Sequence, residues 1–223
     1  MEEHRVKINR IEHVTHDTLK ITTERPYNYS FEPGQATEVA IDKEGWKKET
    51  RPFTFTSLPD DSELEFIIKT YPEHDGTTDK LLDLEVGDHL LIHDVFGAIT
   101  YQGPGTLIAG GAGITPFIAI LRKLEKEGKL EDIQVIFENK TSRDIILHDE
   151  LKSMLGDKLI NILSQEKTDK YFYGYIDETF LKEQLSSLEQ YFYLCGPPQM
   201  VEYLEKTLHN IGVENKWIVK EEE

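Results

Sequence analysis

The chain has 223 residues, of which 38% are hydrophobic and 30% are charged, and its formal net charge is -17. This length suits two domains of about 100 residues each, and the sequence has no apolar run of the roughly 20 residues that a membrane-spanning helix needs. A surface this acidic repels the phosphates of nucleic acids and anionic lipids, so we expect neither nucleic acid nor a membrane as a partner.

Cys195 is the only cysteine of the chain. A single thiol forms no intrachain disulfide, and an iron–sulfur cluster usually needs several cysteine thiolates. The sequence therefore predicts neither a disulfide nor a metal site. Residues 1–8 lack the apolar core of a signal peptide. We therefore expect a cytoplasmic protein.

The first half of the chain has the pattern of short strands, in which apolar residues alternate with polar ones or form short runs. Turn-forming proline, glycine and aspartate residues separate these segments. Such a series favours a small antiparallel β-barrel for residues 1–103, with one short helix inserted. The expected strands cover residues 6–8, 18–22, 51–56, 64–69 and 89–93, and the helix covers 78–84.

The second half alternates strands with helices, and the change of pattern falls at Gly103-Pro104-Gly105. Alternating strands and helices indicate a parallel sheet that is covered on both faces. We therefore expect a Rossmann-like α/β domain over residues 104–223. The expected strands cover 106–109, 133–137, 159–163 and 191–194, and the helices cover 115–127, 148–155, 178–185 and 198–211.

A glycine-rich segment, Gly110-Gly111-Ala112-Gly113-Ile114-Thr115-Pro116, lies between an expected strand and an expected helix. Glycines let the backbone approach a ligand closely. Thr115 suits the N-cap of the helix and Pro116 its first turn, so the helix dipole faces an anion such as a pyrophosphate. Pro116 stands where a G-x-G-x-x-G fingerprint has its last glycine. A plain tight turn between strand and helix is the alternative.

Two further motifs suit a ligand site. Arg51-Pro52-Phe53-Thr54 combines a buried-strand arginine, which suits a phosphate, with an aromatic side chain that suits a flat ring. Tyr193-Leu194-Cys195-Gly196-Pro197-Pro198 places the thiol at the carboxyl end of a strand, where open α/β sheets bind ligands. Taken singly, each motif is better explained by a plain structural role, a surface arginine in the first and a buried structural cysteine in the second.

Together, and in this order, the three motifs resemble those of the ferredoxin–NADP reductase family of flavoproteins, over nearly the whole chain. In that family an R-x-Y-[ST] strand binds FAD, and a G-x-x-[ST] helix start binds its pyrophosphate. A GG-x-G-[IT]-[TA]-P turn binds the nicotinamide nucleotide, and C-G-P-x-x-M closes the site. Gly76-Thr77-Thr78-Asp79 comes close to the second motif. Phe53 replaces the usual tyrosine of the first.

On the flavin side, the resemblance implies that Arg51 neutralises the FAD pyrophosphate. It further implies that Phe53 lies against the isoalloxazine ring and that Thr54 hydrogen-bonds near the ring nitrogen that accepts the hydride. The other flavin-binding residues that it implies are Pro52, the backbone of Ile67, Ile68 and Lys69, and Gly76 with a hydroxyl at Thr77 or Thr78.

On the nucleotide side, the resemblance implies that the glycine turn cradles NADH or NADPH and that Cys195 borders the reactive nicotinamide carbon. A glutamate near the end of the family's chains, usually followed by an aromatic residue, aligns with Glu221, which Glu222 follows here. The resemblance thus implies catalytic roles for Thr54, Cys195 and Glu221. The nucleotide-binding residues are Gly111, Gly113, Thr115, Pro116, Gln165, Cys195, Gly196 and Pro197.

The coenzyme preference rests on Ser164-Gln165-Glu166-Lys167, which matches a serine–arginine pair that grips the 2′-phosphate in NADPH-specific relatives. Gln165 has no charge for a phosphate and Glu166 repels one, so we expect NADH. Glu138 is a further candidate, as an acceptor from the ribose. Lys140, Arg143 and Lys167 are the alternative, as cations that would favour NADPH.

The function that follows is hydride transfer from NAD(P)H to FAD, with electrons passed to a separate acceptor such as a ferredoxin, a flavodoxin or an oxygenase component. Other readings stay open. The chain could be a stand-alone flavin reductase or NAD(P)H oxidase, an electron-transfer subunit of a larger complex, a relative that uses FMN, or a dinucleotide sensor without turnover.

Overall fold

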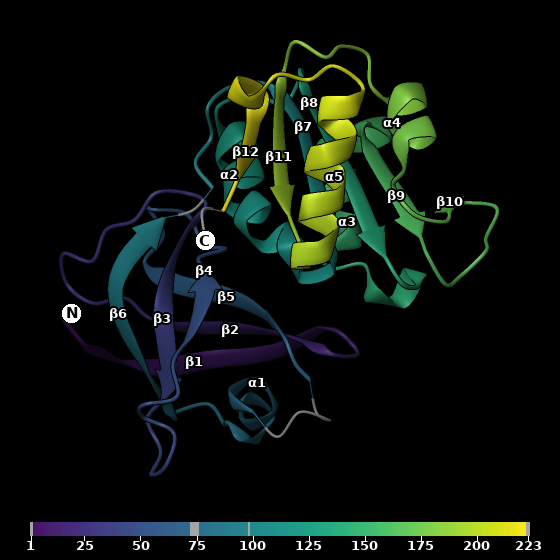
Figure 1. Ribbon diagram of the computed structural model, residues 1–223. Coiled ribbons are helices and arrows are strands. Elements are labelled where there is room, and N and C mark those ends of the chain that lie inside the picture. The colour runs from purple at the N-terminus through teal and green to yellow at the C-terminus, as the bar shows by residue number, and fades with distance from the viewer. Residues whose placement is uncertain (1, 72–75, 98, 222–223) are drawn as a thin grey trace.

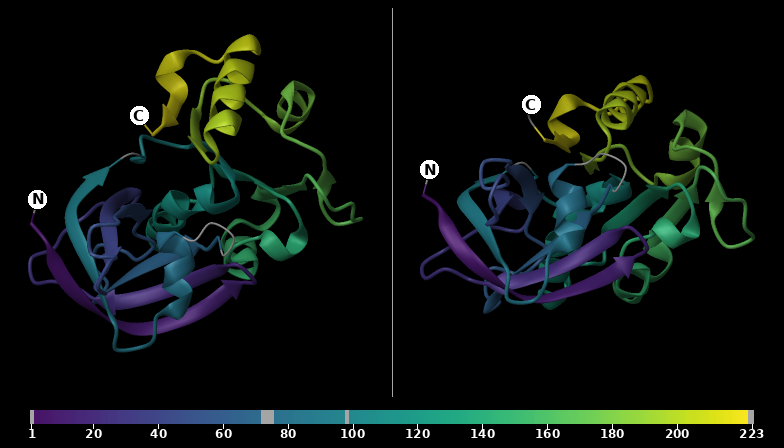
Figure 2. Two further views of the ribbon diagram at one scale, coloured as in Figure 1. Left: turned by 60° about the horizontal axis from the view of Figure 1, so that its bottom comes forward. Right: turned by 90° about the horizontal axis from the view of Figure 1, so that it is seen from below.

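The computed structural model describes residues 2–71, 76–97 and 99–221 (Figure 1). It contains two six-stranded sheets, one in each half of the chain. The first sheet is antiparallel and curls into a barrel, and the second is parallel with helices on its faces (Figures 1 and 2). The fold class expected from the sequence is therefore confirmed.

The barrel sheet has the strand order β4-β3-β6-β1-β2-β5, so that β4 and β5 are its two edges. An isolated antiparallel bridge between Phe55 and Phe66 joins these edges and closes the barrel. Alternate residues of a strand point to the same face of the sheet, and in β2 Leu19 and Ile21 point into the barrel core. Both are at most 2% exposed. The strands are β1 His4–Thr15, β2 Thr18–Glu24, β3 Gln35–Ile41, β4 Arg51–Thr54, β5 Glu63–Lys69 and β6 His89–Gly97, and the helix α1 covers Thr77–Lys80.

The second sheet has the order β10-β9-β8-β7-β11-β12. Helices α2 and α3 bury Leu121 and Leu151 on one face, and α4 and α5 bury Leu181 and Leu208 on the other. The sheet is therefore covered on both sides, as parallel sheets require. The strands are β7 Gly105–Gly110, β8 Ile133–Asn139, β9 Leu159–Leu163, β10 Phe172–Tyr173, β11 Tyr191–Cys195 and β12 Ile218–Lys220, and the helices are α2 Thr115–Lys126, α3 His148–Leu155, α4 Glu178–Gln184 and α5 Pro198–Asn210.

Every expected strand and helix is present, and three strands, β3, β10 and β12, appear in addition. The expected helix 78–84 is α1 followed by a 3-10 turn at Leu81–Asp83. Among the described residues the longest helix is α5, with 13 residues, and none combines the length and apolarity that crossing a membrane demands.

A tyrosine holds the segment of chain that connects the two halves. The hydroxyl of Tyr193, on β11, accepts hydrogen bonds from the backbone N–H groups of Gln102 (2.9 Å) and Gly103 (3.0 Å). It donates to the carbonyl of Gly103 at 2.7 Å. Tyr193 is only 1% exposed. The Gly-Pro segment is therefore fixed to the second sheet.

Candidate functional site

The two edges of the barrel sheet face each other beyond the Phe55–Phe66 bridge. The antiparallel register continues from this bridge toward Thr54 on β4 and Ile67 on β5. No strand pairing is found there among the described residues. Backbone groups on these two edges are therefore open to a ligand. The residues that the sequence singled out, 51–54 and 67–69, line the two sides of this gap.

Arg51 lies on the edge strand β4 and its side chain is exposed, with one hydrogen bond from Nη1 to the carbonyl of Thr50 at 2.6 Å. The expectation that it lies on a buried strand is wrong, because an edge strand leaves its outer side chains in solvent. Within the described ranges no carboxylate pairs with its guanidinium. An unpaired cation beside an open strand edge fits a phosphate group.

Phe53 and Thr54 are half-buried. The ring of Phe53 packs partly against the barrel core, so only part of it is available to a flat ligand. Ile67 and Ile68 bury their side chains, with exposed fractions of 3% and 2%. These two residues therefore offer backbone groups alone, as the family resemblance implies.

The start of α1 is tied to the loop that precedes β4. Thr77 is buried, and its hydroxyl donates to the carbonyl of Glu49 at 3.2 Å. This bond ties Gly76 and α1 to the loop that leads into β4, so Arg51 and Thr78 share one corner of the barrel. Of the two candidate hydroxyls, the one on Thr78 is partly exposed and the one on Thr77 is occupied.

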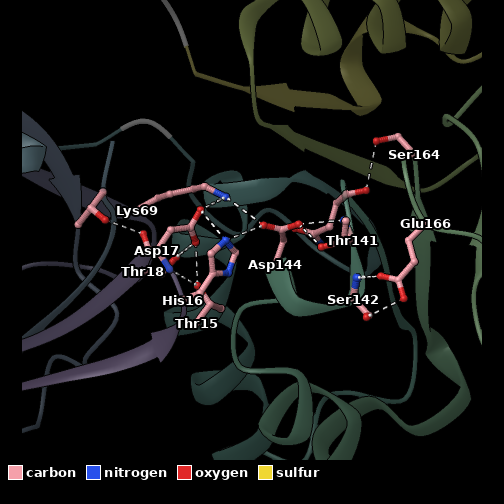
Figure 3. Close-up of polar contacts among 12 residues, drawn as sticks. Thr15, His16, Asp17, Thr18, Lys69, Thr141, Ser142, Asp144, Ser164 and Glu166 are labelled. Carbon is pink, nitrogen blue, oxygen red and sulfur yellow. Dashed lines mark hydrogen bonds and ion pairs between the residues drawn. The ribbon is translucent and has the colours of Figure 1, made fainter. Parts of the chain in front are cut away.

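Lys69, at the end of β5, uses its side chain in a polar network that crosses the domain junction (Figure 3). Its Nζ lies 2.9 Å from Asp17 Oδ2, in the β1–β2 turn, and 3.8 Å from Asp144 Oδ1 in the nucleotide half. His16 Nε2 lies 3.7 Å from an oxygen of each carboxylate. Burial alone would raise the pKa of Asp17, but hydrogen bonds from Lys69 and Thr15 outweigh it and lower the pKa. Lys69 thus lies between two carboxylates, one from each half of the chain.

The glycine turn after β7 is a 3-10 turn, Gly111–Ile114, that runs directly into α2. Ile114 is the N-cap of α2 and has helical dihedral angles, φ -70° and ψ -21°. The expectation that Thr115 is the N-cap is therefore wrong: because the backbone is already helical before it, Thr115 is the first residue of α2. Pro116 lies in the first turn of α2, as expected.

The glycine turn and the turn after β11 interlock through their backbones. A Cβ on Gly113 would collide with the carbonyl of Cys195, and one on Gly196 would lie 3.1 Å from the amide nitrogen of Gly110. Gly111 differs, since its φ is +53° and a Cβ there would meet nothing within 4 Å. Gly113 and Gly196 thus permit close packing, and Gly111 is the glycine that is open to a ligand.

This contact lies where the strand order reverses, between β7 and β11. In open α/β sheets such a switch point forms a crevice at the carboxyl ends of the strands, and ligands bind there. Gly196 and Pro197 follow β11 directly and lie at this edge. The structure therefore brings the glycine-rich segment and the motif that contains Cys195 together.

Cys195 lies beside Glu221, because β11 and β12 pair in parallel with Leu194 opposite Lys220. Burial raises the pKa of the Cys195 thiol to about 12, and the Glu221 carboxylate adds to this rise. The thiol is therefore protonated at neutral pH and is no nucleophile. The end of β12 approaches the junction of the two halves in all views (Figures 1 and 2). A pocket of about 430 Å³ is lined there by Leu194, Cys195, Gly196, Pro198, Val201, Glu202, Lys220 and Glu221.

The loops after β8 and β9 are joined by Glu166, whose carboxylate accepts hydrogen bonds from Ser142 N at 2.6 Å and Ser142 Oγ at 3.1 Å (Figure 3). Gln165 is exposed, and its backbone N–H donates to the carbonyl of Lys140 at 2.9 Å. One oxygen of Glu138 accepts from Ile176 N at 3.1 Å, and burial raises the pKa of Glu138.

One strong contact between the two halves was not expected from the sequence. Arg122, on α2, reaches across to the carbonyl of Thr56 and to Glu65 of β5. Arg122 and Glu65 are 57 positions apart. In the sequence the pair is only an acidic residue on an expected strand and a basic residue on an expected helix, and nothing in the pattern connects the two.

Comparisons with known proteins agree with this arrangement. The profile of an FAD-binding domain matches residues 3–104, and that of an oxidoreductase NAD-binding domain matches residues 107–206. The chain is 30% identical over 201 residues to NADH-cytochrome b5 reductase 1 of Aspergillus oryzae, covering 80% of this chain and 68% of that protein.

The chain is also 27% identical over 217 residues to the reductase component of propane 2-monooxygenase from Mycolicibacterium goodii, covering 89% of this chain and 61% of that protein. The chain thus spans about three fifths of the length of that relative. The flavohem-like FAD/NAD-binding domain of nitric oxide dioxygenase from Vibrio cholerae has the same fold, with a TM-score of 0.86, 21% identity and 96% of each chain covered.

The chain belongs to the ferredoxin reductase-like family of flavoproteins. It contains an FAD-binding domain followed by an NAD-binding domain, and its cofactors are FAD and a nicotinamide dinucleotide.

Proposed function

We propose that this protein transfers a hydride from a nicotinamide dinucleotide to FAD and passes the electrons to a separate acceptor. The observation that supports this most is the pairing of two open sites across one junction. An open strand-edge gap with the free cation of Arg51 lies in one half, and the switch-point crevice at Gly111 and Cys195 lies in the other. Bound FAD supplies hydride acceptance and the release of electrons one at a time.

The flavin domain, which we propose to be residues 1–103, holds its cofactor by charge and backbone. Arg51 and Thr78 bind the pyrophosphate at the start of α1. Thr54 and the backbone of Ile67, Ile68 and Lys69 position the flavin ring. Gly76 and Pro52 shape the two ends of the gap, and Phe53 packs against the ring.

The nucleotide domain, which we propose to be residues 104–223, presents the dinucleotide to the flavin. Gly111 lets the backbone approach the pyrophosphate, and the first turn of α2 directs its dipole there. Cys195 and Glu221 border the nicotinamide. Hydride transfer then depends on two rings held within contact distance with water excluded, and it needs no thiolate.

We propose NADH as the preferred coenzyme. Glu166 is fixed by Ser142 between the two loops that flank the ribose position, and its charge opposes a 2′-phosphate. Gln165 is exposed and uncharged. Gln165→Arg should therefore move the ratio of kcat/KM for the two coenzymes toward NADPH. The ratio is measured in wild type and variant at one ionic strength. A wild type that prefers NADPH contradicts the assignment and points to Lys140, Arg143 or Lys167.

The acceptor that we propose is a separate protein. One relative is named as the reductase component of a monooxygenase and another as a reductase of cytochrome b5. The net charge of -17 opposes docking of a strongly acidic acceptor, so the docking face of the acceptor should be neutral or basic. Electron transfer to a basic acceptor should slow as salt rises.

Colour tests the proposal directly. The purified protein should be yellow, and anaerobic NADH should bleach it. Extraction and chromatography of the flavin then separate FAD from FMN. A colourless protein that binds the dinucleotide without turnover would be a sensor, and rapid oxygen consumption without any acceptor would indicate a stand-alone oxidase. Either result contradicts the proposal.

We propose the cytoplasm as the place of action, since a protonated lone thiol such as Cys195 persists in a reducing compartment. Fractionation of cells with an antibody against the protein tests this.

A further inference from the structure

One arginine joins the two halves of the molecule through ion pairs on both sides. Arg122 lies about two turns beyond the start of α2, and its side chain is 21% exposed. On its own domain, Nε and Nη2 contact the two oxygens of Glu150 on α3, at 2.6 Å and 3.0 Å. On the flavin domain, Nη1 donates to the carbonyl of Thr56 and to Glu65 Oε1, both at 2.7 Å.

Arg122 is the positive charge that lies between two carboxylates, those of Glu65 and Glu150. Burial alone would lower the pKa of Arg122, but the hydrogen bond to Glu150 and the charge of Glu65 outweigh it and raise the pKa. Glu65 and Glu150 come from opposite domains and share this one guanidinium. Without it, two carboxylates would face each other across the junction and repel.

The flavin-side partners of Arg122 are rigid. Thr56 is fully buried, and its hydroxyl donates to Glu65 Oε1 at 2.7 Å while its N–H donates to the carbonyl of Glu65 at 2.9 Å. The N–H of Glu65 in turn donates to Ser57 Oγ at 3.0 Å. Thr56 therefore has no freedom to follow a displaced partner.

Both ends of this link lead to the proposed reaction site. Thr56 stands two residues after Thr54, with the bridged Phe55 between them. Arg122 stands on the helix that continues the glycine turn without a break. The flavin strand β4 is thus connected to the glycine turn through Thr56, the guanidinium of Arg122 and helix α2.

We propose that Arg122 is a positioning residue that sets the distance between flavin and nicotinamide by fixing α2 to the strand end at Thr56. This inference rests on the proposed hydride transfer. In this proposal Arg122 influences the rate of hydride transfer although it touches neither cofactor.

Another ion pair between the domains supplies the matched control. Lys123, the next residue of α2, lies 3.7 Å from Glu32, and the two side chains are 46% and 69% exposed. Exposed pairs of this kind contribute little. Lys123→Met removes one positive charge from the same helix and one contact across the same junction. It should leave the rate of flavin reduction unchanged within about twofold.

The main experiment is stopped-flow reduction of the FAD-loaded protein by saturating NADH. Arg122→Met should slow reduction by about tenfold or more, because a misplacement of 1 Å costs up to about a hundredfold. The Kd for NADH should change little, since the glycine turn is intact. Substitution of both carboxylates as well, with Glu65→Gln and Glu150→Gln, removes the repulsion and should recover part of the rate.

A second readout does not depend on activity. Hydrogen exchange of the protein as purified should show faster exchange at residues 115–126 and 63–69 in Arg122→Met than in wild type or Lys123→Met. If Arg122→Met does not fold, Arg122→Lys serves instead, since one ammonium cannot satisfy Thr56, Glu65 and Glu150 together. Its rate should fall severalfold.

A wild-type reduction rate in a folded Arg122 variant overturns the inference. So does equal slowing in Lys123→Met. The proposed function fails separately, when wild type itself is not reduced by NADH or NADPH. In that case faster exchange in Arg122→Met still supports the link between the domains, and unchanged exchange refutes it.

Discussion

The flavin gap and the nucleotide turn differ in what forms them. The gap lies between two strand edges, and the groups that it offers are an exposed guanidinium, a hydroxyl and unpaired backbone. The turn consists of two backbone segments in direct contact, with glycines at 113 and 196, where a Cβ would intrude on the neighbouring segment. We therefore expect side chains to set affinity in the first site and chain geometry to set it in the second.

This difference predicts how each site responds to substitution. In the gap, removal of one side chain should subtract one interaction and leave the fold intact. In the turn, addition of one methyl group should displace the chain. Four variants, in order of decreasing effect, test this contrast.

Gly113→Ala should have the largest effect. Its Cβ would collide with the carbonyl of Cys195, so the two turns must separate. Overpacking of this kind costs about 1–3 kcal/mol, and NADH binding should be lost. Chemical denaturation and NADH titration measure the two effects. Gly128→Ala is the control, because Gly128 has a left-handed φ of +67° but open space around it. It should lower stability by about 1–2 kcal/mol and leave NADH binding intact.

Arg51→Ala should weaken FAD binding about ten- to a hundredfold. The reason is the loss of a charge-assisted contact to phosphate, which is worth roughly 1.5–3 kcal/mol. FAD occupancy after gel filtration measures this. Lys48→Ala, which removes another exposed cation just before β4, should retain FAD. If a folded Arg51→Ala protein also retains FAD, Arg51 does not belong to the site.

Thr54→Ala should retain FAD but slow its reduction about tenfold. A hydrogen bond that matters mainly in the transition state contributes about 1.4 kcal/mol. Thr54→Ser keeps the hydroxyl and should keep most of the rate. Stopped-flow reduction of both variants at saturating NADH makes the measurement. Equal rates for alanine and wild type would remove Thr54 from the hydride path.

Cys195→Ser should have the smallest effect, a loss of a few fold at most, because the chemistry needs no thiolate. With its pKa raised from 9.0 to about 12, Cys195 at pH 8 has a thiolate fraction about a thousandfold below that of an ordinary cysteine. Iodoacetamide should therefore react slowly with the folded protein. Rapid alkylation or complete inactivation of a flavin-loaded Cys195→Ser variant would contradict this role.

The same pKa shift predicts a pH effect on stability. Below about pH 9 the thiol is protonated in the folded and the unfolded chain, so its contribution is fully present. Above that pH the unfolded chain loses the proton first, and stability falls until about pH 12. Denaturation midpoints of wild type and Cys195→Ser should diverge over this range.

Local pattern predicted much of the fold. The helix at His148–Leu155 and the strand at Leu159–Leu163 have the expected bounds, because each has an apolar face or run that is defined by its own residues. The glycine turn and the thiol at the end of β11 were found in the same way.

What the sequence did not predict depends on distant partners. In β3, Gln35–Ile41 buries residues on both faces and lacks a clean alternation. Strands β10 and β12 have two and three residues and exist through pairing with their neighbours. The exposure of Arg51 follows from the place of β4 at a sheet edge, which its own residues do not encode. The Arg122 contacts likewise arise only when the two domains meet.

Tyr193, at the junction, affects where two such proteins can be joined to form a chimera. In the sequence, the change of pattern falls at Gly103-Pro104-Gly105. In the structure, the hydroxyl of Tyr193 fixes Gln102 and Gly103 to the nucleotide sheet. A chimera that joins a foreign flavin domain at residue 103 would separate this hydroxyl from its partners. The unit that recombines as one piece therefore begins before Gln102, and crossover points upstream of it should yield functional hybrids.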